Sequence, residues 1–248
     1  MTSVSQWMKV LSLVGRLGAG TLGVAMLLPQ MAVAAESNYV HTFYLIRHGT
    51  YLPDPKASPE PGPGLTPLGL AQARLAGARL ASLPVRFNAI TSSTLTRAQQ
   101  TAVEIRAALP QVPGSASSLL SECTPPSTAP APDAAASAAQ AACKQRFDAA
   151  FEKLIVPAKD GDRHDVFVCH GNVIRYFVTK ALGIDTRLYA NFGISNASLT
   201  ILRVRADGSM QVMAVGDAGH IPPNLQSYGG DADPQLVAPA LGVFTTPQ

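Results

Sequence analysis

Short apolar runs and longer amphipathic segments alternate along most of this chain. Three of the short runs are rich in β-branched and aromatic residues and lack polar alternation, at residues 40–46, 87–91 and 165–169. Strands that are apolar on both faces are typical of a parallel sheet covered by helices on its two sides. Two further runs, residues 198–205 and 210–215, flank a turn containing Gly208 and predict a hairpin at one edge of that sheet.

Segments with helical periodicity fill the intervals between the strands. Four are expected, at residues 68–83, 97–109, 133–156 and 172–182. Thr66-Pro67 has the composition of an N-cap followed by a first-turn proline, and Asp133 is a second N-cap candidate. Pro110 ends one helix and Gly183 ends another as a C-cap. The alternation predicts an α/β fold, a three-layer α/β/α sandwich with a mostly parallel central sheet.

The first 34 residues differ in composition from the rest of the chain. Lys9 and Arg16 precede an apolar run at residues 17–28, and Ala32-Val33-Ala34 supplies small residues for cleavage. This pattern is typical of a secretory signal peptide, and the run is short against the roughly 20 apolar residues of a membrane span. An uncleaved N-terminal anchor is the alternative interpretation.

These features predict how the chain is divided and where it resides. The expected parts are a signal peptide or anchor at residues 1–34, a globular catalytic domain at 35–226 and a mobile tail at 227–248. The leader predicts a periplasmic or secreted protein, or one held at a membrane if the leader stays attached. The sequence leaves the oligomeric state open.

The net charge argues against a nucleic-acid partner, and the positions of the three cysteines bear on whether a disulfide forms. Without Lys9 and Arg16 the chain has 17 basic against 16 acidic residues, which gives no electrostatic footprint for nucleic acid. Cys169 lies in an apolar run and is interpreted as a buried strand residue. Cys123 and Cys143 either form a disulfide or stay unpaired, because a sequence does not place their Cα atoms.

Phosphate-binding side chains follow three of the predicted strands. Arg47-His48-Gly49 follows the first, Arg97 lies after the second, and His170-Gly171 follows the third. Ligands bind at the carboxyl ends of parallel strands, so we expect these groups to meet. Guanidinium groups bind phosphate oxygens in pairs, and imidazole is a nucleophile.

The residues around these strand ends resemble the histidine phosphatase superfamily, which has the phosphoglycerate-mutase-like fold. Within it the chain is most similar to the branch of the mitochondrial serine/threonine protein phosphatases, phosphoglycerate mutase family member five. The resemblance covers about residues 43–223 and includes Leu65-Thr66-Pro67-Leu68-Gly69, Thr96-Arg97-Ala98, Cys169-His170 with Asn172-Val173-Ile174-Arg175-Tyr176, and Gly216-Asp217. It differs at the N-terminus, where only residues 35–41 separate the leader from the domain. The assembly mode and partners of that branch are therefore not carried over.

The resemblance implies a set of site residues and a metal-independent, cofactor-free reaction. It implies His48 as the nucleophile, Arg47, Arg97 and His170 as phosphate ligands, and Glu122 as the proton donor. Nearby arginines disfavour protonation of His48, which keeps its lone pair available. Burial would raise the pKa of Glu122, so that it protonates the leaving oxygen and then activates water to hydrolyse a phosphohistidine. His170 adds a further donor to the phosphate and belongs to the catalytic set.

Several function classes remain after this step. The substrate is a phosphorylated protein or a small phosphate ester such as an envelope sugar phosphate. The complete residue set argues against a non-catalytic binding module on the same fold. A phosphomutase is disfavoured, because the intervals of 25 residues from Arg97 to Glu122 and 48 from Glu122 to His170 leave little room for closing insertions. His41, His164 and His220 are interpreted as structural or exposed.

Overall fold

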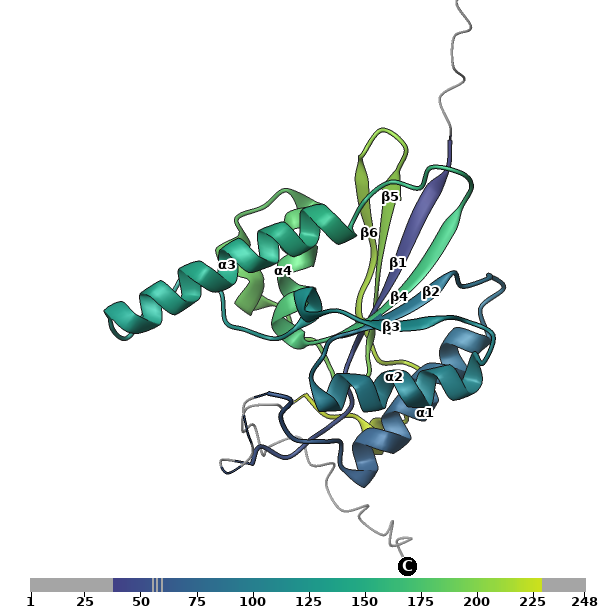
Figure 1. Ribbon diagram of the computed structural model, residues 1–248, viewed down its shortest axis with the longest axis horizontal. Helices are drawn as coiled ribbons and strands as arrows, with labels where there is room; N and C mark the ends of the chain where they lie inside the picture. The colour runs from purple at the N-terminus through teal and green to yellow at the C-terminus, as the bar shows by residue number, and fades with distance from the viewer. Residues whose placement is uncertain (1–37, 55, 57, 59, 229–248) are drawn as a thin grey trace, which may run out of the picture. The chain divides into compact units, whose positions relative to one another are not determined.

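A six-stranded sheet in the order β3-β2-β4-β1-β5-β6 forms the centre of the computed structural model, which describes residues 38–54, 56, 58 and 60–228 (Figure 1). Its strands are β1 (Val40–Arg47), β2 (Ala89–Ser92), β3 (Gly114–Ala116), β4 (Arg163–Cys169), β5 (Leu199–Arg205) and β6 (Met210–Asp217). The strands β3, β2, β4 and β1 run parallel to one another. The pair β5 and β6 is an antiparallel hairpin on the β1 side. The predicted mostly parallel sheet with an edge hairpin is confirmed.

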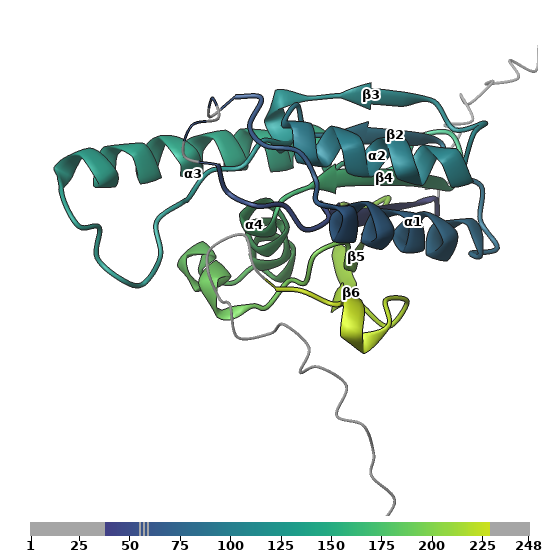
Figure 2. The ribbon, with the colours of Figure 1, turned by 90° about the horizontal axis from the view of Figure 1, so that it is seen from below.

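Helices cover both faces of the sheet (Figures 1 and 2). They are α1 (Pro67–Ala81), α2 (Thr96–Ala108), α3 (Ala134–Leu154) and α4 (Gly171–Leu182), with short 3₁₀ turns η1 (Ser118–Leu120), η2 (Thr186–Asn191) and η3 (Pro223–Leu225). Side chains alternate across β1, so Phe43 and Leu45 pack with α3 and α4, whereas Tyr44 and Ile46 pack with α1 and α2. The expected three-layer α/β/α sandwich is therefore the observed fold.

The helix ends follow the signals in the sequence. The Thr66 hydroxyl accepts the amide N–H of Gly69 at 3.1 Å, and the Asp133 carboxylate accepts that of Ala136 at 2.7 Å. Gly183 ends α4 with φ of 66°, a left-handed conformation that favours glycine. These caps fix where α1, α3 and α4 begin or end, and so where their neighbouring loops reach the sheet.

Strand β3 was not expected from the sequence, and the strand predicted at residues 87–91 begins two residues later, at Ala89. β3 consists of the three exposed small residues Gly114–Ala116 at the sheet edge. Such a segment has no apolar periodicity, and it is extended because the backbone of β2 offers it hydrogen-bonding partners.

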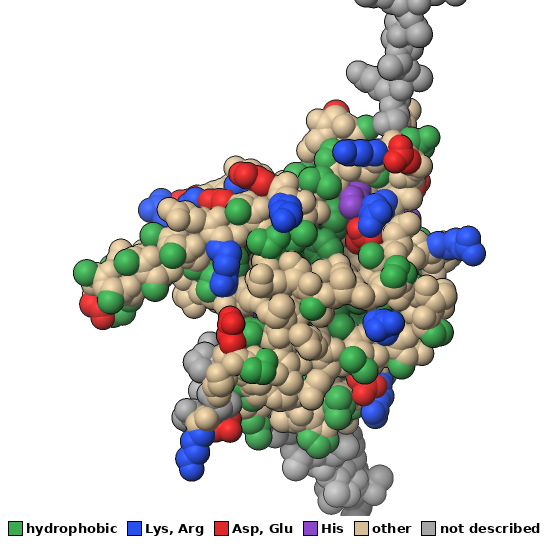
Figure 3. Space-filling view, in the orientation of Figure 1, with side chains coloured by type: hydrophobic (Ala, Val, Ile, Leu, Met, Phe, Trp, Pro, Cys, Tyr) green, Lys and Arg blue, Asp and Glu red, His purple; other side chains and the backbone are tan. Residues whose placement is uncertain are grey.

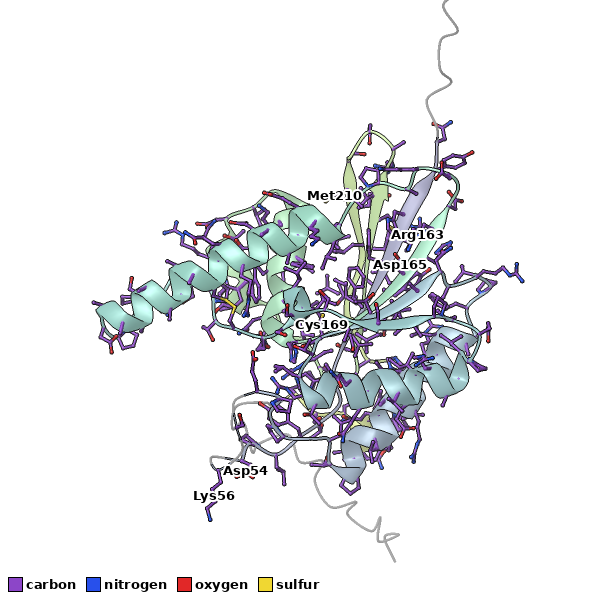
Figure 4. All side chains as sticks on the ribbon, in the orientation of Figure 1. Asp54, Lys56, Arg163, Asp165, Cys169 and Met210 are labelled. Atoms are coloured by element: carbon purple, nitrogen blue, oxygen red, sulfur yellow. A yellow bond between two sulfur atoms is a disulfide. The ribbon has the colours of Figure 1, made fainter. Side chains whose placement is uncertain are left out.

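Cys123 and Cys143 form a disulfide that joins the loop after η1 to the middle of α3 (the yellow bond in Figure 4). Their Cα atoms are 5.8 Å apart, within the usual range for a disulfide. The sequence left open whether Cys123 and Cys143 are paired, and in the structure they are. Cys169, also as expected, is a buried free thiol.

Removing this cross-link should destabilise the fold measurably. Because the bond closes a loop with a sequence separation of 20, we expect the double substitution Cys123→Ser and Cys143→Ser to lower the free energy of unfolding by about 3 kcal/mol. The measurement is a denaturant titration of both proteins. Reduced wild type is the control and should match the double variant, and equal stabilities of oxidised and reduced wild type would contradict the prediction.

The end of β4 opposite to Cys169 carries an ion-pair cluster in which His41 and Asp165 are buried and Arg163 is exposed (Figure 4). Asp165 accepts hydrogen bonds from His41 at 3.1 Å and from Arg163 at 2.8 Å. Burial acts to raise the pKa of Asp165, but the bonds from His41 and Arg163 outweigh it and hold that pKa below its usual range. His41 is therefore structural, as the sequence suggested.

Candidate active site

The strand register brings the two predicted site histidines together. Arg47 lies opposite Cys169 in the parallel pair β1 and β4, so the next residues, His48 and His170, leave the sheet side by side. The backbone N–H of His48 donates to the Cys169 carbonyl at 2.9 Å. Their ring centroids are 5.0 Å apart. The site is thus a direct consequence of the parallel pairing.

Hydrogen bonds fix the tautomer of His48. Its Nδ1 lies 2.8 Å from the Gly49 carbonyl oxygen, which can only accept, so Nδ1 carries the proton. The Nε of Arg97, which can only donate, lies 3.2 Å from Nε2 of His48. Both contacts agree with a neutral ring whose Nε2 lone pair faces the site.

Gly49 allows the chain to turn directly after His48. A Cβ at this position would collide with the backbone carbonyl of Gly69 in α1. The Gly49 amide donates to the Thr101 hydroxyl at 3.0 Å, which ties the turn to α2. This close packing holds the carbonyl that orients the His48 ring.

Two buried arginines flank His48. Arg97 comes from the first turn of α2, is 8% exposed, and its guanidinium carbon lies 4.7 Å from the centre of the Tyr51 ring. Arg47 ends β1 and is 7% exposed. It donates to the backbone carbonyls of Ile194 and Tyr228. Both guanidinium groups are permanently charged, so the site attracts anions.

The environment keeps both histidines neutral. Burial, followed by the charges of Arg47 and Arg97, holds the pKa of His48 well below its usual range. Burial is also the largest cause of the lowered pKa of His170, with further contributions from His48 and Arg97. His170 Nε2 lies 2.8 Å from the Ser93 hydroxyl, and its Nδ1 is buried with no hydrogen-bonding partner among the described residues.

Glu122 lies between η1 and the N-terminus of α4. Its Oε2 accepts the backbone N–H of Asn172 at 3.4 Å, and its Oε1 is buried without a hydrogen-bonding partner in the described part of the chain. Burial raises the pKa of Glu122 to about 7, although Asn172, Arg47 and Arg97 act to lower it. A carboxyl group with this pKa can both give and take a proton near neutral pH.

The contacts of the neighbouring backbone hold Glu122 in place. Arg146 of α3 donates to the Ser121 carbonyl at 2.9 Å, and the Asn172 side chain donates to the Cys123 carbonyl at 3.0 Å. The disulfide then joins Cys123 to α3. The chain on both sides of Glu122 is therefore fixed.

The predicted site residues meet at one cavity of about 440 Å³. Its walls are formed by Arg47, His48, Tyr51, Arg97, Glu122, Thr124, Gly171, Asn172, Arg175 and Tyr228. His170 is fully buried next to His48. A second cavity of about 490 Å³ lies near His41 and Asp165, and none of the predicted site residues lines it. All five predicted residues thus belong to one site.

Sequence reasoning missed six of the lining residues, which are Tyr51, Thr124, Gly171, Asn172, Arg175 and Tyr228. Arg175 had a usable signal, since it follows Asn172 by three positions and shares its helix face. Tyr228 had none, and the predicted tail at residues 227–248 included it.

The start of that predicted tail belongs to the site. The Ser227 hydroxyl bonds to the Thr50 hydroxyl, the Gln72 amide and Asn196, and the Tyr228 carbonyl bonds to Arg47. Ser227 and Tyr228 are therefore bonded to residues of the domain. Residues 229–248, like the leader at 1–34, lie outside the described residues, so the division of the chain stays a prediction there.

A parallel sheet whose carboxyl edge presents a neutral histidine between arginines, with a carboxyl group of pKa about 7, defines a phosphoryl-transfer site. The chain belongs to the histidine phosphatase superfamily (branch 1), whose family model matches residues 43–125 and 124–217. It is a histidine-type phosphatase.

Relatives agree with this assignment. The chain is 36% identical over 222 residues to the mitochondrial serine/threonine-protein phosphatase Pgam5 of Caenorhabditis briggsae, covering 85% of this chain and 73% of the relative. It is 38% identical over 189 residues to the human protein of that name, covering 73% and 64%. The chain thus spans about two thirds of the human relative's length.

Solved structures share the fold. A phosphoglycerate mutase from Plasmodium falciparum superposes with a TM-score of 0.53 at 24% identity, covering 72% of this chain and 92% of that one. A mycobacterial glucosyl-3-phosphoglycerate phosphatase gives 0.52 at 19% identity, covering 72% and 100%. At these identities the likeness concerns the fold alone.

The relatives contradict the expected location. The matched proteins are mitochondrial, so the prediction of a periplasmic or secreted protein is wrong. In the part of the chain that the structure describes, no helix combines the length and apolarity that crossing a bilayer requires. The segment interpreted as a signal peptide or anchor lies outside that part.

Proposed function

We propose that this phosphatase removes phosphate from phosphoserine or phosphothreonine residues of proteins, through a phosphohistidine on His48. The observation that supports it most is the neutral Nε2 of His48 between two cationic guanidinium groups. The names of the relatives, serine/threonine-protein phosphatases, support the class of substrate.

In the first half-reaction Arg47 and Arg97 bind oxygens of the phosphoryl group, and His170 adds a hydrogen bond. The N–H groups of Arg97 turn from His48 Nε2 to the phosphoryl oxygens, which frees the lone pair. Nε2 attacks phosphorus, and the bond from phosphorus to the ester oxygen breaks. Protonated Glu122 gives its proton to the leaving oxygen, which departs as an alcohol.

In the second half-reaction the ionised Glu122 takes a proton from water. The resulting hydroxide-like oxygen attacks phosphorus, the bond from phosphorus to Nε2 breaks, and inorganic phosphate leaves. Glu122 is protonated again and His48 is again neutral. Each side chain thus returns to its starting form after one turnover.

Surface charge is mixed on the face of the molecule that Figure 3 shows. Figure 3 shows cationic and anionic side chains interspersed over the described part of the face in view, without a broad patch of one sign. That face therefore lacks the broad cationic patch that is typical of nucleic-acid-binding proteins.

A substrate panel tests the proposed class. We expect kcat/KM to be higher for phosphoserine and phosphothreonine peptides than for sugar or nucleotide phosphates. A higher kcat/KM for the sugar phosphates would favour the alternative, a phosphatase of small phosphate esters.

Activity should not depend on a divalent cation. Among the described residues no three His, Cys, Asp or Glu side chains gather as a metal site requires, and the proposed steps use side chains alone. We expect hydrolysis of p-nitrophenyl phosphate to persist in a strong chelator and to be inhibited by vanadate, which adopts the five-coordinate geometry of the transferring group. Loss of activity on chelation, restored by a divalent cation, would contradict the mechanism.

A further inference from the structure

The lining of the cavity contains more cationic than acidic side chains. Its lining includes three arginines, Arg47, Arg97 and Arg175, and one carboxyl group, Glu122. Glu122 must be protonated to act as the donor, and His48 is neutral. In the proposed mechanism Arg47 and Arg97 bind the phosphoryl group, and Arg175 has no part in it.

Arg175 is a cation of the cavity wall that forms no ion pair with any of the described residues. Its Nη1 donates to the neutral side-chain oxygen of Asn172 at 3.4 Å, and its Nε is buried without a hydrogen-bonding partner among the described residues. Arg74, Arg163 and Arg187 each form an ion pair with a carboxylate, whereas no ion pair in the described part of the chain includes Arg175. A partly buried guanidinium in a cavity wall is suited to bind an anion from outside the chain.

The position of Arg175 is set by Glu122 and Asn172. The Asn172 backbone bonds to the Glu122 carboxyl group, and its side chain bonds to Arg175. In the proposed mechanism Glu122 protonates the ester oxygen of the leaving group. The part of the substrate beyond that oxygen therefore lies on the side of the cavity that Asn172 and Arg175 line.

We propose that Arg175 forms a second anion subsite, which binds a carboxylate carried by the leaving group of the substrate. The substrate class is then a phosphomonoester with a carboxylate close to the ester oxygen. In a phosphoprotein this is an acidic residue next to the phosphoserine, and in a small molecule it is a carboxylate on the ester itself. The inference rests on the proposed function, because the role of Glu122 defines the side of the cavity that the leaving group occupies.

Matched substrates that differ in one charge test the subsite. The first pair is a phosphoserine peptide with aspartate beside the phosphoserine and the same peptide with asparagine. The second pair is phosphoglycolate and its amide. With wild-type protein, kcat/KM should be higher for the carboxylate member of a pair by about 10-fold to 100-fold, the range of a charge-assisted hydrogen bond.

Arg175→Gln should bring that ratio close to one. The ratio separates a subsite from a structural effect, because a disturbed Asn172 or Glu122 would slow both members of a pair equally. Arg79→Gln is the matched control, since Arg79 lies in the last turn of α1, outside the cavity lining, and loses the same charge. It should keep the wild-type ratio. Arg175→Lys, which keeps a point charge without the planar fork, should give an intermediate ratio.

The outcomes are distinct. A response of the peptide pair identifies the carboxylate as a protein side chain, and a response of the phosphoglycolate pair alone identifies a small ester. A wild-type ratio near one for both pairs overturns the subsite, as does a ratio that Arg175→Gln leaves unchanged. If Arg175→Gln does not fold, the wild-type and Arg175→Lys ratios decide. Failure of the phosphatase function shows separately, as wild-type protein that does not hydrolyse p-nitrophenyl phosphate.

Discussion

Replacing His48 by alanine should lower the rate of p-nitrophenyl phosphate hydrolysis by at least about 10³-fold, because the variant lacks the nitrogen lone pair that attacks phosphorus. The Nε2 of His48 is the lone pair that faces the site, since Nδ1 is committed to the Gly49 carbonyl. The measurement is steady-state hydrolysis, together with acid-labile phosphate on the trapped enzyme.

The control for this variant is His164→Ala. His164 lies in β4, is partly buried beside Tyr44 and does not line the cavity. It should retain activity and acid-labile labelling. Because the pKa of His48 is held well below its usual range, wild-type enzyme should also stay active in mildly acidic buffer. Substantial activity of His48→Ala, with acid-stable labelling elsewhere, would contradict the assignment.

Glu122→Gln should slow hydrolysis of phosphoserine peptides by about 10²-fold to 10⁴-fold, because the amide can neither protonate a serine oxygen nor activate water. With p-nitrophenyl phosphate the leaving group needs no proton. The variant should therefore release one nitrophenolate per site quickly and then stall as the phosphoenzyme. A rapid-mixing experiment that counts this burst is the measurement.

The pH dependence of kcat/KM of the wild-type enzyme is a second test of the role of Glu122. Glu122 donates only when protonated, and its pKa is about 7. The protonated fraction is high below this pH and falls above it, so kcat/KM for phosphoserine peptides should decline as the pH rises through 7. Glu122→Gln should lack that decline. The exposed Glu152→Gln of α3 should behave as wild type, and an unchanged profile in Glu122→Gln would assign the titration to another group.

The strand ends made most of the site predictable from the sequence. The carboxyl ends of parallel strands all lie at the same edge of a sheet. Arg47-His48, Arg97 and His170 each follow such a strand, so they were expected at that one edge. Glu122 lies outside any strand or helix, and its place came from the resemblance to the family. The structure then supplied its contacts with Asn172.

Other parts of the site depend on long-range contacts that leave no local pattern. Tyr228 reaches Arg47 across an interval of 181 residues through a backbone carbonyl, which every residue has. Cys123 and Cys143 pair because η1 and α3 pack together. The predicted location was wrong for a different reason. An apolar run followed by small residues is the pattern of a leader segment, but this pattern does not identify the compartment in which the protein resides.

The bond between Tyr228 and Arg47 also has a consequence for protein synthesis. Arg47 ends β1, whereas one of the two carbonyls that accept its hydrogen bonds belongs to Tyr228, which is synthesised 181 residues later. Chains fold from the N-terminus as they are made. A nascent chain therefore carries its nucleophile early but completes the anion-binding pocket only after translation has passed residue 228. Unfinished chains of this phosphatase therefore lack one of the hydrogen bonds that position Arg47.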